Sequence, residues 1–464
     1  MKVALFTEGG EKKGYGHVTR CLALYHAFRA RGADAELILD GDAAAAGLLA
    51  GARHRRLSWR KKGPGTLAAL RSAGIAVVDS YLAPSSFYSF AAKNVRLLVC
   101  LDDTNRLTYP AGLVVNGAIA AASLPYPKSS GIRYLLGAEY APLRKEFWNC
   151  PRPAARRNMG RMLITLGGAD AAGLAEKIAG FIKREFNTNV TVFGARRRSA
   201  AEVRREMLRS DVCVTACGQT TYELAACGVP AIGIGFAENQ RLNIKGWTAK
   251  RAMKFAGWKN DKNLFENIKN LLGGLSYPER AALGMRAREI TDGGGALRIA
   301  EAALSAYNEP PAFTLRRAVL RDSRNIFRLS NMPEVRANSI STGKIEWAAH
   351  RRWFAAKIKD PAVFFLVAEI GGVFAGQLRY AVTGSEALVS VSISDFFRGR
   401  GLAAPLLTAG NEKLFSTFRS VRRINAFIRP DNKASIKAFG RAGYKFERRV
   451  SINKVRLGKY AAKR

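Results

Sequence analysis

Short apolar segments alternate with amphipathic helices along the first part of the chain, and this alternation constrains the fold more than any other feature. We expect buried strands at residues 2–6, 35–39, 75–78 and 95–101. After the first strand, apolar residues recur at helical spacing and predict a helix over residues 18–31. Repeated strand–helix units imply a parallel sheet that is covered by helices on both faces.

A second series of strands and helices follows a linker. Residues 151–157 are rich in proline and arginine and interrupt the pattern. After them, strands are expected at residues 162–166, 212–216 and 231–234, and the alternation continues to residue 307. Two such α/β lobes joined by a linker imply a cleft between them.

The C-terminal region has a different pattern. After the boundary Asn308-Glu309-Pro310-Pro311, strands follow one another directly, with Gly371-Gly372 as a hairpin turn. These strands are expected at residues 313–318, 364–370, 373–380 and 387–393. This order is typical of an α+β domain. For a chain of 464 residues, the sequence therefore predicts three domains, at residues 1–150, 158–307 and 313–464.

The composition favours a globular protein of a reducing compartment. Hydrophobic residues make up 48% of the chain, but no window approaches the roughly 18 unbroken apolar residues of a membrane span. The N-terminal residues lack the apolar run and cleavage site of a signal peptide. The six cysteines form no CxxC pair, and no nearby histidine completes a zinc set. We therefore expect a cytoplasmic protein without a membrane partner or a metal.

The charge is strongly basic: 75 Lys and Arg residues against 36 Asp and Glu residues give a net charge of +39. The excess is spread along the chain and forms no basic tail. It indicates either a nucleic-acid footprint or a less specific cause, which is a basic proteome or a general pull on anionic nucleotide substrates. No aromatic-interleaved RNA motif accompanies the charge. We therefore prefer the second interpretation and expect no nucleic-acid partner.

A glycine-rich turn after the first strand holds the first candidate catalytic residue. The segment Gly14-Tyr15-Gly16-His17 leads from the strand into the next helix, with His17 at the helix start. The helix dipole there disfavours an imidazolium and keeps the histidine neutral, as a base requires. His17 could equally cap the helix or pack on the sheet, and the local pattern does not separate these roles.

The second lobe offers two turns for a nucleotide. Gly167-Gly168-Ala169-Asp170 follows a strand, with Asp170 as the expected helix N-cap. Gly218-Gln219-Thr220 opens a short helix, and small residues at a helix N-terminus suit a phosphate. Glu223, one turn in, could hold ribose hydroxyls. However, Thr220-x-x-Glu223 is also the pattern of a capping box, in which Glu223 would serve only the helix.

The third domain contains a basic glycine turn, Arg398-Gly399-Arg400-Gly401-Leu402-Ala403, which follows a strand and opens a helix. Glycines let backbone N–H groups close on a pyrophosphate, and the arginines add charge. Asn432 and then Gly443-Tyr444 follow at the next helix and the final strand.

Together these motifs resemble two known families joined end to end. Residues 1–307 are similar to the UDP-sugar hydrolases of pseudaminic acid synthesis (the PseG family), relatives of the two-lobed GT-B glycosyltransferases. The similarity lies in GYGHVTRCLAL (14–24), VVDSY (77–81), LDD (101–103), Asn116, LLGAEYAPLR (135–144), ITLGGAD (164–170), CGQTTYELAACGVPAI (217–232) and Asn239-Gln240. It implies two Rossmann-like lobes in a GT-B-like arrangement.

The resemblance also implies roles for single residues. The histidine of the family's GxGH motif acts in hydrolysis, which implies this role for His17. The family's late Asn-Gln pair points to Asn239 as a contact of the reacting sugar, with Gln240 in the substrate site. The expected substrate-binding set is completed by Gly14, Gly16, Gly168, Gly218, Thr220 and Glu223. Such enzymes release UDP by attack of water at the anomeric carbon, without a metal. The longer turn Glu11-Lys12-Lys13 departs from the family and could alter the sugar pocket.

Residues 313–464 resemble the GNAT acetyltransferases, and residues 350–380 are similar to the amino-sugar N-acetyltransferases of the same pathway (the PseH group). The resemblance implies that Arg398, Gly399, Arg400, Gly401, Leu402, Ala403 and Asn432 bind acetyl-CoA. Many GNAT enzymes place a tyrosine seven residues after the helix asparagine, to protonate the departing thiolate. Here that position is Phe439, so the general acid is unassigned.

The sequence thus predicts a bifunctional nucleotide-sugar enzyme whose partners are a UDP-amino-sugar and acetyl-CoA. Its C-terminal domain would acetylate the 4-amino group of a UDP-4-amino-sugar. Its N-terminal half would hydrolyse UDP-2,4-diacetamido-2,4,6-trideoxy-β-L-altropyranose to UDP and the free sugar. The alternative is a GT-B glycosyltransferase fused to a protein or small-molecule N-acetyltransferase.

Overall fold

The computed structural model divides the chain into two compact units, Met1–Pro127 with Arg133–Leu304, and Lys128–Ile132 with Ser305–Arg464. It describes residues 1–11, 13–127, 131–151, 155–167, 173–193, 198–310, 312–370 and 372–464. Apart from residues 128–132 and 305–307, both predicted α/β lobes fall within the first unit. The domain limits at residues 1–150, 158–307 and 313–464 stay a prediction.

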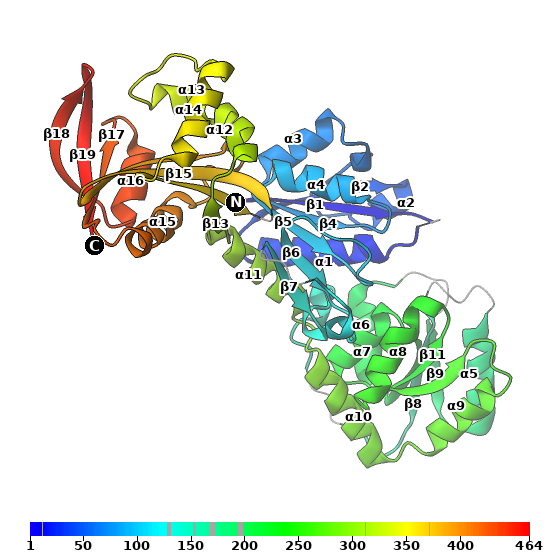
Figure 1. Cartoon of the computed structure of the whole chain (residues 1–464). Coiled ribbons are helices and arrows are strands. Elements are labelled where there is room, and N and C mark those ends of the chain that lie inside the picture. The colour runs from blue at the N-terminus through cyan, green and yellow to red at the C-terminus, as the bar shows by residue number, and fades with distance from the viewer. Residues whose placement is uncertain are drawn as a thin grey trace. The chain divides into compact units, whose positions relative to one another are not determined.

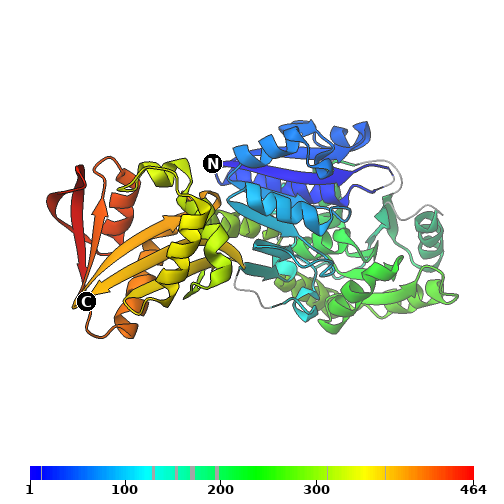
Figure 2. The same ribbon diagram turned by 45° about the horizontal axis from the view of Figure 1, so that its top comes forward.

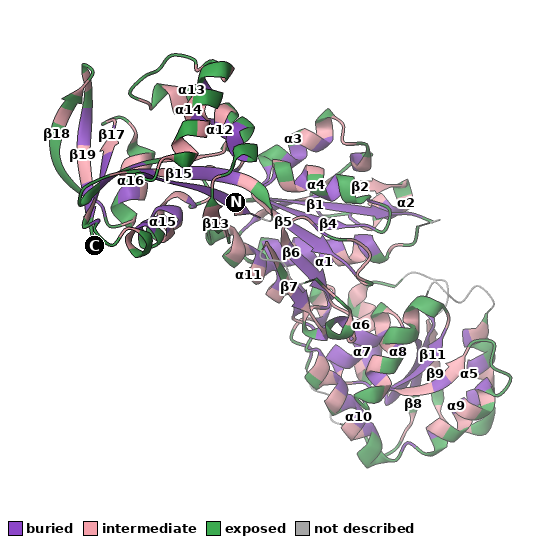
Figure 3. Ribbon diagram, in the orientation of Figure 1, coloured by how far each residue is buried: buried purple, intermediate pink, exposed green. Residues whose placement is uncertain are grey.

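The first lobe is built on a sheet in the order β3-β2-β1-β4-β5-β6-β7, in which the pairs from β3 to β6 are parallel. Its elements are β1 (Lys2–Gly9), α1 (Gly16–Ala30), β2 (Asp34–Gly41), α2 (Ala43–Gly47), β3 (His54–Arg56), α3 (Pro64–Ser72), β4 (Ile75–Asp79), α4 (Ser85–Asn94), β5 (Leu97–Leu101), β6 (Gly112–Asn116) and β7 (Ile132–Leu136). All five residues of β4 are buried, as the continuous apolar run of a doubly covered parallel strand predicts (Figure 3).

The strand order of this sheet reverses between β1 and β4. The chain leaves β1 toward β2 on one side and reaches β5 from β4 on the other. Right-handed crossovers then place α1 on one face and α3 and α4 on the opposite face, as Figures 1 and 2 show. The carboxyl ends of β1 and β4 therefore border a crevice, which is where ligands bind in open α/β sheets.

The second lobe repeats this design with the parallel order β12-β11-β10-β8-β9. Its elements are β8 (Arg161–Thr165), α5 (Leu174–Glu185), β9 (Asn189–Phe193), α6 (Ala200–Arg209), β10 (Val212–Ala216), α7 (Gln219–Cys227), β11 (Ala231–Gly235), α8 (Arg241–Ala249), β12 (Lys254–Trp258), α9 (Leu264–Gly273), α10 (Tyr277–Ile290) and α11 (Gly295–Asn308). The order reverses between β8 and β10, so the turns at Gly167 and Gly218 both lie at the switch point.

The second unit has a mixed sheet in the order β13-β14-β15-β16-β17-β19-β18. Its elements are β13 (Thr314–Arg317), α12 (Ser323–Ser330), α13 (Pro333–Ala337), α14 (Trp347–Lys359), β14 (Val363–Ile370), β15 (Val373–Thr383), β16 (Glu386–Ile393), α15 (Ala403–Thr417), β17 (Arg423–Ile428), α16 (Lys433–Arg441), β18 (Lys445–Ile452) and β19 (Val455–Lys463). Strands β16 and β17 pair in parallel only where Glu386–Leu388 face Arg423–Asn425. Beyond this short ladder the carboxyl ends of the two strands separate.

The predicted fold class, two α/β lobes followed by an α+β domain, is confirmed. Strand β10 has the predicted limits, and α1 begins two residues earlier than expected, at Gly16. The hairpin turn is confirmed by the antiparallel pair Ile370↔Val373, although Gly371 lies outside the described residues. Asp170 also lies outside them, and the N-cap of α5 is Gly173. Among the described residues, no helix is both long and apolar enough to cross a membrane.

Candidate active sites

His17 lies at the crevice of the first lobe and is bound by a buried carboxylate. It is the second residue of α1, and only 7% of its surface is exposed. Asp79, the last residue of β4, places its Oδ1 atom 2.6 Å from the His17 Nδ1 atom. The switch point thus brings together two residues that are 62 positions apart in the chain.

Arg20, one turn after His17 on α1, binds the same carboxylate. Its Nε donates to Asp79 Oδ2 at 2.9 Å and its Nη2 to Asp79 Oδ1 at 2.7 Å. Its Nη1 donates to both oxygens of Asp103, which follows β5, at 2.8 Å. Burial opposes the charge of Arg20, but the two carboxylates outweigh it and raise the pKa of the guanidinium. Arg20 therefore links the ends of β4 and β5.

These charges determine which nitrogen of His17 carries the proton. Burial opposes ionisation of Asp79, but Arg20 and His17 outweigh it, so the pKa of this carboxyl lies below its usual value. An ionised carboxylate only accepts hydrogen bonds, and a guanidinium only donates them. His17 Nδ1 lies 2.6 Å from Asp79 Oδ1, which can only accept, and 2.9 Å from Arg20 Nη2, which can only donate. We assign the hydrogen to Nδ1 because the contact with Asp79 is the shorter and Arg20 Nη2 already donates to Asp79 Oδ1 at 2.7 Å. In neutral His17 the lone pair is then on Nε2, where a general base needs it.

Tyr81 completes the polar cluster around His17. Its ring packs edge-on against the imidazole, with the centroids 4.5 Å apart, and its hydroxyl donates to Asp103. The buried carboxylate of Glu8, in β1, accepts from the backbone N–H groups of Tyr81 at 2.9 Å and Leu82 at 3.2 Å. Tyr81 remains 48% exposed, so one face of the ring can meet a ligand.

Sequence reasoning identified His17 but assigned no role to Asp79, Arg20, Tyr81 or Asp103, although all four lie in motifs that carry the family resemblance. A carboxylate at the end of a fully buried parallel strand is the pattern that would have found Asp79, because strand ends meet at the same sheet edge.

The two predicted glycines of the His17 turn, Gly14 and Gly16, are exposed at the start of α1. Gly14 has a φ of +74°, which favours glycine, and a β-carbon at Gly16 would meet no atom within 4 Å. No other described residue therefore covers the backbone of the turn at these two glycines.

In the second lobe, α7 begins at Gln219 with Gly218 as its N-cap, and no side chain caps the helix. The capping-box interpretation of Thr220 and Glu223 is therefore wrong. Thr220 is half-buried in the first turn of the helix. Gly168 lies outside the described residues.

Glu223 is buried, and its Oε1 accepts from Arg144, from Nη2 at 2.8 Å and from Nε at 2.9 Å. Burial raises the pKa of Glu223, and Arg144 partly opposes this shift. Arg144 follows β7, the last strand of the first lobe, so this ion pair joins that lobe to α7 of the second lobe.

Asn239 and Gln240 lie in a short 3₁₀ turn, Glu238–Gln240, after β11. Asn239 is exposed. The Gln240 Oε1 accepts from the backbone N–H of Phe236 at 2.7 Å and of Ala237 at 3.3 Å. Gln240 thus holds the turn that presents Asn239, while its contact with a substrate stays a prediction.

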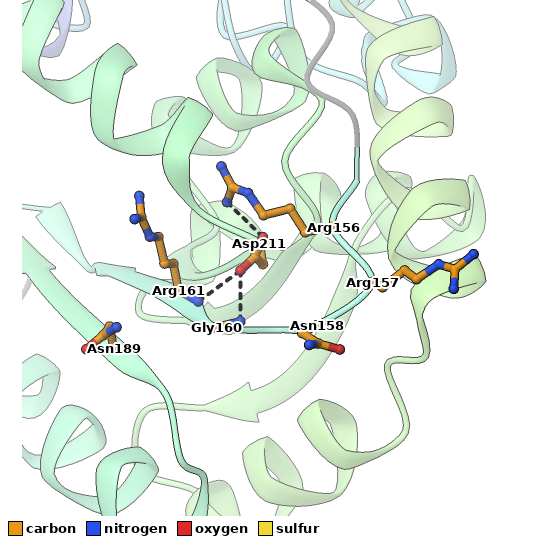
Figure 4. Close-up of a pocket in the computed structure, with 7 residues that line it drawn as sticks. All are labelled: Arg156, Arg157, Asn158, Gly160, Arg161, Asn189 and Asp211. Carbon is orange, nitrogen blue, oxygen red and sulfur yellow. Dashed lines mark hydrogen bonds and ion pairs between the residues drawn. The ribbon is translucent and has the colours of Figure 1, made fainter.

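A pocket of about 530 Å³, lined in part by arginines, lies at the N-terminal ends of the strands of the second sheet, away from the switch point. Asp211 accepts there from Arg156 Nη1 at 3.0 Å and from the backbone N–H groups of Gly160 and Arg161 at 2.9 Å. Figure 4 shows that the side chain of Arg157 points away from those of Arg156 and Arg161. They form no convergent site, and Asp211 serves to fix the start of β8.

In the second unit, the predicted glycine turn lies between β16 and α15. Gly399 and Gly401 have φ angles of +73° and +74°. Arg400 stacks on Phe396, with its guanidinium carbon 4.2 Å from the ring centroid. Leu402 is the buried N-cap of α15, and Ala403 is its first residue. The turn thus presents a backbone loop at the N-terminus of a 15-residue helix.

Arg398 contacts protein groups instead of projecting freely into this opening. Its Nε donates to the Ile393 carbonyl at 2.8 Å, and its Nη1 lies 3.4 Å from Glu334 Oε2. Its Nη2 lies 3.6 Å from the Met332 sulfur. Arg398 therefore joins the end of β16 to α13, and its contact with a cofactor stays a prediction.

Asn432 is the N-cap of α16, where its side chain accepts from Ser435 N at 3.0 Å. Phe439 is buried against Tyr444, with the ring centroids 4.9 Å apart. The Tyr444 hydroxyl donates to Asn411 at 2.9 Å inside the core. Tyr444 therefore supplies no exposed proton donor in place of the missing tyrosine.

The described residues contain no group of three or more His, Cys, Asp or Glu side chains placed to hold a metal ion. All six cysteines are buried and free, as core residues would be.

A mixed sheet that opens between two parallel strands, with a glycine turn leading into a helix, defines a class of acetyltransferase. Residues 312–445 match the family described as "Acetyltransferase (GNAT) domain". The chain therefore carries a GNAT acetyltransferase domain, and the protein is an enzyme.

One curated relative matches a large part of the chain. It is the Helicobacter pylori (strain ATCC 700392 / 26695) protein "Pseudaminic acid cytidylyltransferase and UDP-2,4-diacetamido-2,4,6-trideoxy-beta-L-altropyranose hydrolase". The two sequences are 23% identical over 282 residues, which is 58% of this chain and 51% of that protein. The chain thus spans about half the length of the curated relative that it matches.

Solved structures of acetyltransferases are similar to one third of the chain. The aminoglycoside acetyltransferase AAC(6')-Ib with paromomycin and acetyl-CoA is 17% identical and covers 33% of this chain and 93% of its own, with a TM-score of 0.30. The spermidine N-acetyltransferase of Vibrio cholerae with CoA and spermine is 17% identical and covers 32% of this chain and 95% of its own, with a TM-score of 0.31.

Proposed function

We propose that the protein is a bifunctional, cytoplasmic enzyme of pseudaminic acid synthesis. Its second unit N-acetylates the 4-amino group of a UDP-4-amino-sugar with acetyl-CoA. Its first unit hydrolyses the product, UDP-2,4-diacetamido-2,4,6-trideoxy-β-L-altropyranose, to UDP and the free sugar. The curated relative's name and the GNAT domain support the two activities.

The observation that carries the hydrolase proposal is the His17–Asp79 contact at the switch point of the first lobe. The Nε2 atom of His17 takes a proton from a water molecule while the water oxygen bonds to the anomeric carbon. The bond between that carbon and the phosphate oxygen breaks, and UDP leaves with the electron pair. Asp79 stabilises the imidazolium that forms, as carboxylates do in hydrolases with a histidine base. The exposed Asn239 and the α7 N-terminus are proposed to hold the sugar and the nucleotide.

The transferase proposal rests on the opening between β16 and β17 and on the glycine turn before α15. Acetyl-CoA supplies a thioester carbon for attack by the substrate's neutral amine. The residues present fit such a ligand, because Gly399 and Gly401 have no β-carbons to obstruct the approach of a pyrophosphate to the backbone of the turn. Asn432 begins the next helix on the opposite side of the opening.

The Asp79→Asn variant tests the hydrolase proposal. Asparagine can donate to Nδ1 and would favour the wrong tautomer of His17, so we expect the kcat of UDP release to fall about 10²- to 10⁴-fold. The KM should change little because Asp79 is buried behind His17. Steady-state release of UDP, with CoA release by the same sample as the control for folding, checks this result. An unchanged kcat would remove the proposed role of the pair.

Glu223→Ala and Arg144→Ala together test whether Glu223 binds the nucleotide. If Glu223 holds the ribose, its loss should weaken UDP binding by roughly 1–3 kcal/mol, while Arg144→Ala should weaken it less. If Glu223 serves only the ion pair, both variants should lower the melting temperature alike and leave the UDP affinity unchanged. Calorimetric titration with UDP and thermal unfolding separate the two outcomes, of which we expect the first.

A further inference from the structure

Two arginines of the second unit converge on one serine. Arg336, in α13, donates from Nη2 to the Ser339 hydroxyl at 3.0 Å. Arg429, directly after β17, donates from Nη2 to the Ser339 carbonyl at 3.0 Å. Both guanidinium groups are therefore bonded to oxygens of one residue, although Arg429 is 90 positions from Ser339 in the chain.

Neither arginine has a carboxylate partner among the residues that the structure describes. The Nε atoms of Arg336 and Arg429 are both buried and have no hydrogen-bond partner there. Burying a charged donor without a partner costs free energy, and two neighbouring cations repel each other. The arrangement is therefore unfavourable unless an anion joins it.

Arg316, in the same unit, is an arginine with carboxylate partners and serves as a comparison. It binds Asp322 and Glu369 at 2.7 and 2.6 Å, and these hydrogen bonds raise the pKa of its guanidinium. The pKa of Arg336 shifts the other way, below its usual value, because burial acts without a carboxylate to offset it.

The donors are held in place by the backbone around them. Arg336 Nη1 donates to the Gly343 carbonyl at 3.0 Å, and the Ser339 hydroxyl donates to the Val335 carbonyl at 2.7 Å. The two guanidinium groups are thus positioned before any ligand arrives, which reduces the entropy lost on binding.

The pair lies at the opening of the acetyltransferase sheet. Arg429 follows the carboxyl end of β17, the strand that separates from β16. At the end of β16, Arg398 contacts Met332 and Glu334, which lie at the start of α13. The α13 segment, residues 332–339, is thus bound to the ends of both strands.

We propose that Arg336 and Arg429 bind the diphosphate of a nucleotide-linked amine, the acceptor of the acetyl group. A diphosphate offers oxygens to two guanidinium groups at once and neutralises both. Coenzyme A carries the same chemistry, but the glycine turn and the α15 N-terminus already provide its pyrophosphate site. The choice of acceptor rests on the proposed function of the second unit.

Kinetics of acetyl transfer by the full-length enzyme test this site. With a UDP-4-amino-sugar as the acceptor, Arg336→Gln and Arg429→Gln should each raise the acceptor KM about 10- to 100-fold. The KM for acetyl-CoA and the kcat should stay within about twofold. Arg441→Gln, at an exposed arginine that ends α16, is the matched control and should change neither KM. Inorganic pyrophosphate should compete with the acceptor in the wild type and about tenfold less well in both variants.

A rise in the KM for acetyl-CoA alone would assign the pair to the cofactor and overturn the acceptor site. Unchanged values for both substrates would overturn the anion site itself. If a Gln variant fails to fold, Arg429→Lys keeps the charge and should show a smaller rise in the acceptor KM. If the wild type acetylates no UDP-amino-sugar, the proposed function fails. The anion site is then tested by whether pyrophosphate raises the melting temperature more in the wild type than in the Arg336→Gln/Arg429→Gln double variant.

Discussion

His17→Ala should lower the rate of UDP release by about 10²- to 10⁴-fold and leave acetyl transfer unchanged. The imidazole is the group that Asp79 and Arg20 position at the crevice, with Nδ1 bound to Asp79 at 2.6 Å. Alanine provides no base, and the water molecule must then lose its proton to solvent. Coupled assays for UDP and for CoA on the same preparation measure both rates.

His26→Gln is the matched control for this variant. His26 lies nine residues further along α1, where it packs against Tyr25 with ring centroids 5.4 Å apart, away from the end of β4. We expect it to release UDP at the wild-type rate. UDP release by His17→Ala at that rate would show that another group accepts the proton.

Gly401→Val should abolish measurable acetyl-CoA binding while UDP release from the diacetamido sugar continues. The φ of Gly401 is +74°, where a β-branched residue is strained, so valine would shift the turn and place side-chain atoms where the pyrophosphate approaches. A β-carbon at this position would meet no protein atom within 4 Å. The variant should therefore fold, and titration calorimetry with acetyl-CoA measures the loss.

Gly384→Val separates strain from ligand contact. Gly384 has a φ of +59° in the turn between β15 and β16, and a β-carbon there also meets no atom within 4 Å. The two variants should lose similar stability, but only Gly401→Val should lose acetyl-CoA. Tight binding by a folded Gly401→Val protein would mean that the cofactor does not approach this turn.

The sequence predicted those strands in which every consecutive residue is buried. Strand β10 was placed at its observed limits because Val212–Ala216 is a short apolar run between polar and glycine residues. Strands such as β9, with the sequence NVTVF, and β7, with IRYLL, were missed because they are partly exposed and a polar residue interrupts each apolar run. Their pairing depends on neighbours that are distant in the sequence.

In the candidate sites, likewise, the sequence could predict residues that a local pattern marks, but not contacts between distant segments. His17 could be found because a glycine turn and a helix start mark it locally. Its contact with Asp79 could not be found, because it depends on the pairing of β1 with β4. For Glu223, the local pattern favoured a capping box equally well, and only the structure reveals Arg144 as its partner. Likewise, nothing near Arg398 in the sequence predicts its contacts with Met332 and Glu334.

The central claim is that one chain acetylates and then hydrolyses a UDP-amino-sugar. Its most direct test is NMR analysis of the products formed by the full-length enzyme from a UDP-4-amino-4,6-dideoxy-N-acetyl-L-altrosamine and acetyl-CoA, with water as the sole acceptor. We predict that CoA and the UDP-2,4-diacetamido sugar appear first, followed by equal amounts of UDP and free 2,4-diacetamido-2,4,6-trideoxy-L-altrose. Omission of acetyl-CoA should prevent UDP release. An acetylated UDP-sugar that stays intact until another acceptor is added would contradict the hydrolase and identify a glycosyltransferase instead.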